Sequence, residues 1–304
     1  MTLRAGSAGG RTGLAPWHCS PHHPYPARGH PAPHPVGGPL PLVATDLDGT
    51  LLRSDGTVSP YTAEVLRALD AQGVPVLFVT ARPLRWMTDL WPLVGRHGLA
   101  VLSNGAVWYD VAGQRVRELR GIEPRAGIAL CAELAQALPG AAFAIECLDG
   151  IRFDPDYVPD DYSAPDRPRG PLCEVWTSPA AKILVQGTQW QPSTLREIAT
   201  STVGDRAIVT WTSPHLLELS APGVTKATTL ARICTELGVP ADDVVAFGDM
   251  PNDSAMLRWA GRSHAVANAD REVLDLVDEV IPANDDDGVA RTLQTLFSLT
   301  VHPR

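Results

Sequence analysis

The sequence predicts an α/β protein built on a doubly wound parallel sheet, with a second α+β domain inserted into it. Short apolar runs alternate with helix-like segments from Pro41 to Gly105 and again after Gly223. Short connections in such a pattern imply right-handed crossovers and parallel strands. Between these stretches strands follow one another more closely, which is typical of an antiparallel α+β insert. We therefore expect a core domain at residues 41–111 and 217–304 and an inserted domain at residues 112–216.

The first part of the core begins with a buried strand, because the apolar run Leu42–Thr45 ends directly in Asp46. Ser59 and Pro60 suit the N-cap and first turn of a helix, which Gly73 ends. The later elements expected here are a strand at 74–79 that ends in Thr80, a helix after Pro83, a strand at 100–102 and a hairpin at 107–120 around Gly113.

The same criteria predict the elements of the insert and of the returning core. In the insert we expect helices at 124–138 and 193–202 and strands at 142–147, 182–186, 207–211 and 216–219. In the returning core we expect a helix at 225–237, a strand at 244–247, a helix from about Asn252, a strand at 264–267 and a helix from Asp270.

Residues 1–40 differ in composition from everything that follows, since they are rich in Pro, Gly and His and contain no acidic residue. Pro removes a backbone donor and Gly is costly to order, so we expect a disordered tail. A metal site is the alternative, and its candidate ligands are His18, Cys19, His22 and His23.

Overall composition excludes several classes of protein. The formal net charge of −9 argues against a nucleic-acid binder or an anionic-membrane binder. No apolar run approaches the length of a membrane helix, and the first ten residues lack the apolar region of a secretory signal. The five cysteines are scattered and form no C-x-x-C pair, which favours reduced thiols and a cytoplasmic location. Either a monomer or a homodimer is compatible with these features.

Acidic residues follow two of the expected strands. Asp46 and Asp48 lie directly after the first strand, and Asp249 and Asp253 follow the strand at 244–247. Parallel strands place their carboxyl ends at one edge of the sheet, where ligands bind. Carboxylates that converge there repel one another unless a cation neutralises them, and oxygen ligands favour Mg²⁺ over zinc. An ordinary acidic turn at Asp48-Gly49 and a helix N-cap at Asp249 or Asn252 are the structural alternatives.

Thr80 and Lys226 stand where phosphate groups are commonly bound. Thr80 ends the second strand and Lys226 lies in the first turn of a helix, so each would place a donor beside backbone N–H groups. A threonine cap and a solvated lysine are the alternatives. Lys182 and Lys226 are the only lysines in a chain that otherwise uses arginine, which favours a functional role for Lys226.

Taken in order, these motifs resemble the haloacid dehalogenase (HAD) superfamily, and in particular its Cof-type branch, which has a large α/β cap. The resemblance covers about residues 41–298. It rests on D-x-D-G-T-L at 46–51, the strand-end threonine, S-N-G-A at 103–106, G-V-T-K at 223–226, F-G-D-M-P-N-D at 247–253 and N-D-D-D-G-V-A at 284–290. Ala81 and Ala227 replace glycines that are frequent in the branch, and neither substitution removes a reacting group.

The resemblance implies roles for individual residues. Asp46 would be the nucleophile that forms an aspartyl-phosphate, and Asp48 would be the general acid and base. Mg²⁺ would bind Asp46, the Asp48 backbone carbonyl and Asp249, with Asp253 and Asn252 in supporting contacts. Residues expected to bind substrate or phosphate are Thr80, Arg82, Asn104, Gly105, Lys226 and Asn252.

The function implied is a Mg²⁺-dependent phosphatase of small phosphorylated metabolites, such as sugar or polyol phosphates or similar compounds. A phosphomutase on the same core and a non-enzymatic phospho-acceptor are the alternatives. The inserted domain would act as a cap that closes over the site, excludes water and recognises the leaving group. Its acidic stretch, residues 149–166, would contact substrate hydroxyls or an amine, or else form a solvated loop.

Overall fold

The computed structural model describes residues 41–159 and 167–301. The expected tail at residues 1–40, with its alternative metal site, lies outside the described residues. So does the part of the acidic stretch at 160–166. Within the described ranges, no helix is long and apolar enough to cross a membrane.

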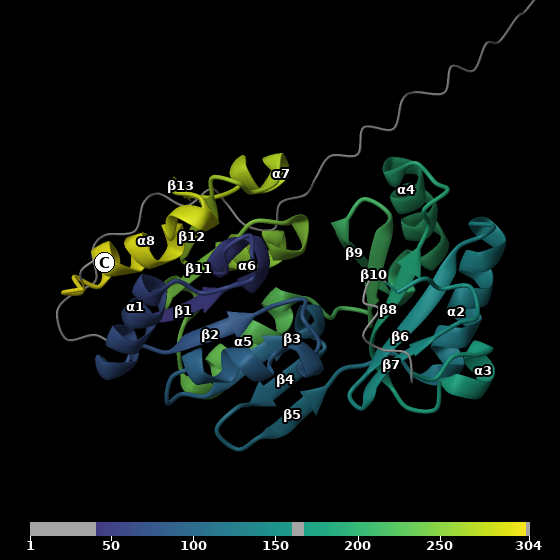
Figure 1. Cartoon of the computed structure of the whole chain (residues 1–304), viewed down its shortest axis with the longest axis horizontal. Coiled ribbons are helices and arrows are strands. Elements are labelled where there is room, and N and C mark those ends of the chain that lie inside the picture. The colour runs from purple at the N-terminus through teal and green to yellow at the C-terminus, as the bar shows by residue number, and fades with distance from the viewer. Residues whose placement is uncertain (1–40, 160–166, 302–304) are drawn as a thin grey trace, which may run out of the picture. The chain divides into compact units, whose positions relative to one another are not determined.

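The larger of two sheets has eight strands in the order β13-β12-β11-β1-β2-β3-β4-β5 (Figure 1). Its strands are β1 (Leu42–Thr45), β2 (Val76–Val79), β3 (Leu99–Leu102), β4 (Val107–Asp110), β5 (Arg115–Leu119), β11 (Val244–Gly248), β12 (Arg262–Val266) and β13 (Glu279–Ile281). The six strands from β13 to β3 pair in parallel, and β4 and β5 continue the sheet antiparallel. The order moves outward from β1 in both directions, which confirms the doubly wound parallel core.

Apolar residues on β1 explain why helices cover both faces of this sheet. Val43 packs into one core cluster, whereas Leu42 and Ala44 pack into another, because successive side chains of a strand point to opposite faces. Helices α1 (Pro60–Ala71) and α8 (Gly288–Leu296) contribute to the first cluster, and α5 (Lys226–Leu237), α6 (Ser254–Trp259) and α7 (Arg271–Leu274) to the second. Both faces of the sheet are therefore buried, as a parallel sheet requires.

The second sheet is antiparallel and has the order β7-β6-β8-β10-β9. Its strands are β6 (Ala142–Cys147), β7 (Gly150–Phe153), β8 (Ala180–Gln186), β9 (Ile208–Ser213) and β10 (Leu216–Ser220), and its helices are α2 (Pro124–Ala137), α3 (Leu172–Val175) and α4 (Pro192–Val203). Leu134 of α2 and Leu195 of α4 share a core cluster with Ile145 and Ile183, so these two helices cover one face of the sheet. The expected α+β insert is confirmed.

Strand pairing shows that the chain passes from the large sheet to the small sheet after residue 112, and that it returns to the large sheet after residue 216. Strand β5, which ends at Leu119, pairs with β4 of the large sheet. Strand β10, which ends at Ser220, pairs with β8 and β9 of the small sheet. Ile122 already pairs with Ala180 of the small sheet. We propose that the inserted domain lies between Leu119 and Ser220, because hydrogen-bonded pairing defines membership of a sheet more directly than a change in sequence pattern.

Two expected helices are shorter than the sequence predicts. After Pro83 the chain forms 3₁₀ turns at Leu84–Trp86 and Thr88–Leu93, and Pro92 lies within the second. Proline lacks the donor that an α-helix needs at that position. The segment after Met250 likewise begins with a 3₁₀ turn, Pro251–Asp253, before α6. Strand β7 was not expected and lies within the acidic stretch.

Candidate active site

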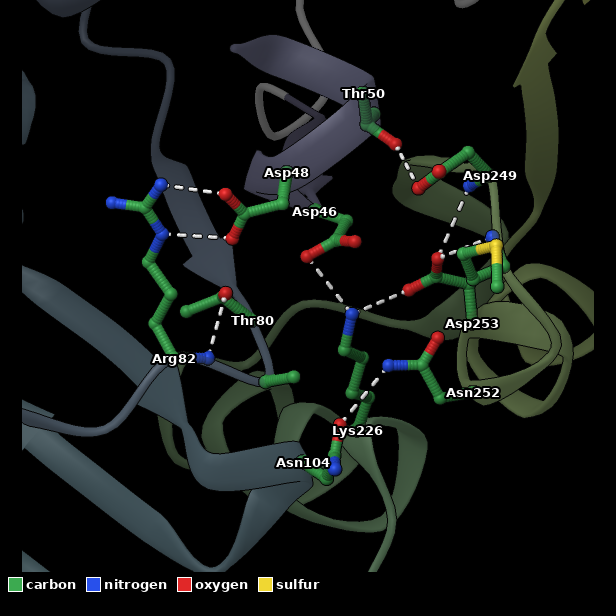
Figure 2. Close-up of polar contacts among 12 residues, drawn as sticks. Asp46, Asp48, Thr50, Thr80, Arg82, Asn104, Lys226, Asp249, Asn252 and Asp253 are labelled. Carbon is green, nitrogen blue, oxygen red and sulfur yellow. Dashed lines mark hydrogen bonds and ion pairs between the residues drawn. The ribbon is translucent and has the colours of Figure 1, made fainter. Parts of the chain in front are cut away.

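The acidic residues lie at the carboxyl ends of two neighbouring strands. Strand β1 pairs with β11, with Thr45 opposite Phe247, so Asp46 and Asp249 emerge side by side. Helix α5 places Lys226, its first residue, against the same edge, and the Thr225 side chain caps this helix by accepting the backbone N–H of Thr228. Figure 2 shows these side chains converging from separate elements.

Lys226 links two of the carboxylates. Its Nζ lies 2.9 Å from Asp46 Oδ1 and 2.7 Å from Asp253 Oδ1, and its side chain is 0% exposed. Burial lowers the pKa of Lys226, but the carboxylates of Asp253 and Asp46 outweigh burial and raise that pKa above its ordinary value. The ammonium therefore stays charged, and it holds the Asp46 carboxylate in one orientation.

The three buried carboxylates of Asp46, Asp249 and Asp253 are crowded. Ligand atoms of Asp46, Asp249 and Asp253 all lie within 4.8 Å of one another. Burial, followed by repulsion from Asp253, raises the pKa of Asp46 above its ordinary range and raises the pKa of Asp249 to about 7. One ammonium does not balance three acids, so this edge favours an additional positive charge.

The donor set fits a hard divalent cation. Asp253 is already engaged, because its Oδ1 accepts from Lys226 and its Oδ2 accepts the N–H groups of Asp249 and Met250 at 3.1 and 3.2 Å. Its position favours the supporting role over direct metal ligation. The carboxylates of Asp46 and Asp249 are the oxygen donors that a cation would bind. The raised pKa of Asp249 reflects the unfavourable free energy of its charged form, and a bound cation would stabilise that form.

The Asp48 side chain lies apart from this cluster and pairs with Arg82. Arg82 Nε and Nη2 donate to the two carboxylate oxygens at 2.7 and 2.5 Å, and the Asp48 side chain is 56% exposed (Figure 2). Asp48 could therefore contribute only its backbone carbonyl to a metal beside Asp46. This carboxyl is therefore open to solvent apart from its contact with Arg82.

Thr80 lies at the end of β2, as the sequence predicts. It is fully buried, and its Oγ1 accepts the Arg82 backbone N–H at 3.0 Å. A hydroxyl that accepts one bond keeps its proton for another acceptor, such as a phosphoryl oxygen.

Asn104 and Asn252 pair with each other. Asn252 Nδ2 donates to Asn104 Oδ1 at 3.1 Å, and Asn104 Nδ2 donates to Glu218 Oε2 at 2.5 Å. Both ends of the Asn104 amide are thus engaged within the protein, which favours a supporting role for Asn104 over direct phosphate binding. Asn252 Oδ1 is buried and has no hydrogen-bond partner among the described residues.

Gly105 is needed for a close approach of two backbones. Its φ is +105°, and a Cβ here would lie 2.2 Å from the Thr225 carbonyl oxygen. We expect Gly105→Ala to destabilise the protein by about 2 kcal/mol or more and to displace the start of α5, which lowers kcat. Chemical denaturation and steady-state assays measure both effects.

The control for Gly105→Ala is Gly56→Ala. Gly56 has a similar positive φ of +79°, but nothing lies within 4 Å of its added Cβ. In this variant the free energy of unfolding should fall only by the cost of the positive φ, about 1 kcal/mol, and kcat should not change. Equal losses in the two variants would show that the contact with Thr225 is unimportant.

The sequence did not assign roles to some residues that the structure places at the site. Thr50 Oγ1 donates to Asp249 Oδ1 at 2.8 Å, and Asn268 Nδ2 donates to the Gly49 carbonyl at 2.8 Å. Thr50 belongs to the D-x-D-G-T-L segment, and this motif could have identified it. Glu218 carried no comparable signal, because it stands alone in an apolar strand.

The comparison with known protein families defines the class of protein as a hydrolase. The model of the haloacid dehalogenase-like hydrolases matches residues 43–293, and the chain belongs to this family. The resemblance found in the sequence is thereby confirmed.

Relatives named as phosphatases match most of the chain. It is 26% identical to 5-amino-6-(5-phospho-D-ribitylamino)uracil phosphatase of Bacillus subtilis, over 85% of this chain and 98% of the relative. It is also 26% identical to phosphoglycolate phosphatase of Halorubrum lacusprofundi, over 86% and 99%. A haloalkanoate-superfamily phosphatase from Bacteroides thetaiotaomicron has the same fold, with a TM-score of 0.74 at 21% identity over 88% of this chain and 98% of that one. The chain is an enzyme of the phosphatase type within this family.

Proposed function

We propose that this protein is a Mg²⁺-dependent phosphatase of small sugar or polyol phosphates. The observation that carries the proposal is the Asp46 carboxylate, which Lys226 holds at 2.9 Å beside Asp249. A carboxylate fixed in this way can act as a nucleophile, and the ammonium beside it can offset part of the negative charge on the phosphoryl group of an incoming ester.

Two chemical steps follow from this arrangement. In the first, an Asp46 oxygen bonds to phosphorus while the bond from phosphorus to the ester oxygen breaks, and Asp48 gives its proton to the departing alcohol. In the second, Asp48 takes a proton from water, the water oxygen bonds to phosphorus, and phosphate leaves Asp46. Lys226 and Thr80 hold the phosphoryl oxygens in both steps. Mg²⁺ bound by Asp46, the Asp48 carbonyl and Asp249 would supply positive charge to the same oxygens.

The substrate class rests on the relatives rather than on the inserted domain. The ribitylaminouracil phosphatase is named for a phosphorylated polyol chain, which supports a sugar or polyol phosphate here. The acidic stretch gives less support. Asp154 accepts the backbone N–H groups of Phe143, Asp156 and Tyr157, and Asp149 pairs with Arg152, so these two carboxylates serve the fold.

The four cysteines in the described residues are free thiols, in keeping with the proposed cytoplasmic location.

A phosphomutase is the remaining alternative within the enzyme class. It would use the same Asp46 and Asp48 and would need a bisphosphate activator. Assays of a phosphorylated sugar panel with and without the matching bisphosphates separate the two. Isomerised phosphosugar in place of free phosphate would identify a mutase.

Metal dependence is expected in both activity and stability. Chelation should abolish turnover, and Mg²⁺ should restore it. Without metal, the raised pKa of Asp249 means that the folded state holds a proton that the unfolded state has lost between pH 3.8 and about 7. Unfolding free energy should therefore fall as pH rises through this window. Because Mg²⁺ binds the deprotonated carboxylates, the rise in Tm that it causes should grow over the same range.

Thermal melts in chelator and in Mg²⁺ at several pH values test this expectation without any substrate. The control is Asp249→Asn, which removes one of the two carboxyls with a raised pKa and should weaken the pH dependence in chelator, with Asp46 left to account for the remainder. Full activity in excess chelator, or a Mg²⁺ shift in Tm that is independent of pH, would contradict the proposed site.

A further inference from the structure

Three buried charged residues lie side by side on the face of the small sheet that α2 and α4 do not cover. Glu146 on β6 is directly opposite Lys182 on β8, and Glu218 on β10 is opposite Leu184, two residues along β8. Glu146, Lys182 and Glu218 are only 2%, 5% and 4% exposed. We call these three residues the charged row. It lies on the face opposite α2 and α4, because the alternate residues Ile145 and Ile183 pack into the cluster beneath these helices.

Each residue of the charged row is hydrogen-bonded to a residue of the core domain. Arg85 donates through Nε and Nη2 to the two oxygens of Glu146 at 3.0 and 2.9 Å. Lys182 Nζ donates to the Ala81 carbonyl at 3.0 Å and to Glu218 Oε1 at 2.5 Å. Glu218 Oε2 accepts from Asn104 Nδ2. The row thus joins two separate turns of the core.

Both turns carry the proposed phosphate site. Ala81 stands between Thr80 and Arg82, so Lys182 holds the peptide that links the buried hydroxyl to the partner of Asp48. Asn104 donates its backbone N–H to the Thr80 carbonyl at 3.1 Å and accepts from Asn252 at 3.1 Å. A continuous path of hydrogen bonds therefore runs from Lys182 through Glu218 and Asn104 to the edge of the carboxylate cluster (Figure 2 shows its last step).

A contribution to stability does not by itself explain why the Lys182–Glu218 ion pair is buried here. Removing two charges from water costs several kcal/mol, and apolar residues of similar volume often replace a buried pair without loss. The precise bonds to Ala81 and Asn104 are what apolar residues could not supply. Directional contact with the phosphate-binding turns is therefore the property that accounts for the pair.

We propose that Lys182 and Glu218 are positioning residues, which couple the seating of the inserted domain to the geometry of the phosphate-binding turns. Lys182 fixes the Ala81 peptide, and Glu218 fixes the Asn104 amide. Turnover depends on the inserted domain because these two bonds align Thr80 and Asn252 with Asp46. This inference rests on the proposed phosphatase function.

The test is the double variant Lys182→Met/Glu218→Met, measured in Mg²⁺ with a small phosphate monoester such as p-nitrophenyl phosphate. It removes both charges and keeps the volume but leaves the Ala81 carbonyl and the Asn104 amide without these partners, so Tm should fall modestly, and by less than in Lys182→Met alone. We expect kcat to fall by about 10- to 100-fold, the scale of a small misplacement of reacting groups. Inhibition by inorganic phosphate should weaken as well, because the turns that bind it are no longer held. Lys182→Met alone should lower both kcat and Tm, since it leaves Glu218 buried and uncompensated.

The matched control is Glu133→Gln, which breaks a bidentate but exposed ion pair with Arg206 in the same domain. It should change neither kcat nor Tm. A double variant with wild-type kcat would overturn the proposal and leave a structural pair. If the double variant fails to fold, Glu218→Gln decides. Its NH₂ group replaces one of the two accepting oxygens and is itself a donor, so in the present geometry the bond to Lys182 or the bond to Asn104 is lost. Wild-type kcat and phosphate inhibition in that variant would therefore overturn the proposal too.

Failure of the proposed function is a separate outcome. A wild-type protein that hydrolyses no phosphate monoester in Mg²⁺ would refute the phosphatase. Calorimetric binding of inorganic phosphate to wild type and double variant would then judge the positioning role directly. Weaker binding by the double variant would uphold that role, and equal binding would end it.

Discussion

Asp46→Asn is expected to abolish turnover, with kcat lowered by at least about 10⁴-fold, the scale seen when a covalent nucleophile is removed. The amide cannot form the phosphoenzyme, and its weaker acceptor no longer pairs with the Lys226 ammonium at 2.9 Å. The fold should persist. Burial and the nearby acids raise the pKa of Asp46, so the ionised form is costly in the absence of metal, and Tm in chelator should stay level or rise. Steady-state assays and thermal melts measure the two effects.

Asp48→Asn separates the nucleophile from the general acid. This variant keeps Asp46, so it should turn over slowly but still accumulate phosphate on the protein, because Asp48 is also the base for the second step. Peptide mapping should then place the label on Asp46. Asp275→Asn, which affects an exposed helical ion pair with Arg271, is the control and should leave kcat unchanged. A label on any other residue would overturn the assignment of Asp46.

Most of the site residues that the sequence predicted follow the ends of strands. Asp46, Thr80 and Asp249 each come directly after a short apolar run, and neighbouring parallel strands bring such positions together. Lys226 was found because it begins a capped helix in a chain almost without lysine. The doubly wound core was predictable for the same reason: its strands are short, apolar and regularly separated.

The contacts between the two domains could not be predicted in this way. Glu218 and Asn104 are 114 residues apart, and Lys182 and Ala81 are 101 residues apart. Nothing local in a strand such as β8 tells which of its faces meets another domain. The expected boundary at residue 112 placed β5 in the insert, because a hairpin in the sequence does not reveal which sheet it joins. Asp48 was predicted to be the general acid and base, and its pairing with Arg82 depends on side-chain geometry that a motif does not contain.

The burial of Lys226 changes what its removal should do to stability. A solvated lysine, or one that only strains the site, could be lost without cost. Lys226 instead has no exposed side-chain surface and bonds to Asp46 and Asp253. Lys226→Met would leave buried carboxylates uncompensated, a change that typically costs about 3–5 kcal/mol. We expect a marked drop in Tm in chelator. Mg²⁺ should restore part of it, because the cation would reduce the repulsion among the same buried carboxylates.

Lys226→Arg is the decisive variant, because it keeps the charge in a chain that uses arginine almost everywhere else. A planar guanidinium is broader than an ammonium, and the buried position leaves no space for the added atoms. It would push Asp46 away from the line of attack, so kcat should fall by about 10²-fold or more, as when one transition-state donor is lost. Thermal melts in Mg²⁺ identify the folded fraction, so that kcat refers to folded enzyme. A Lys226→Arg protein with wild-type kcat would mean that any nearby positive charge suffices, and the fixed contact between Lys226 and Asp46 would have no part in catalysis.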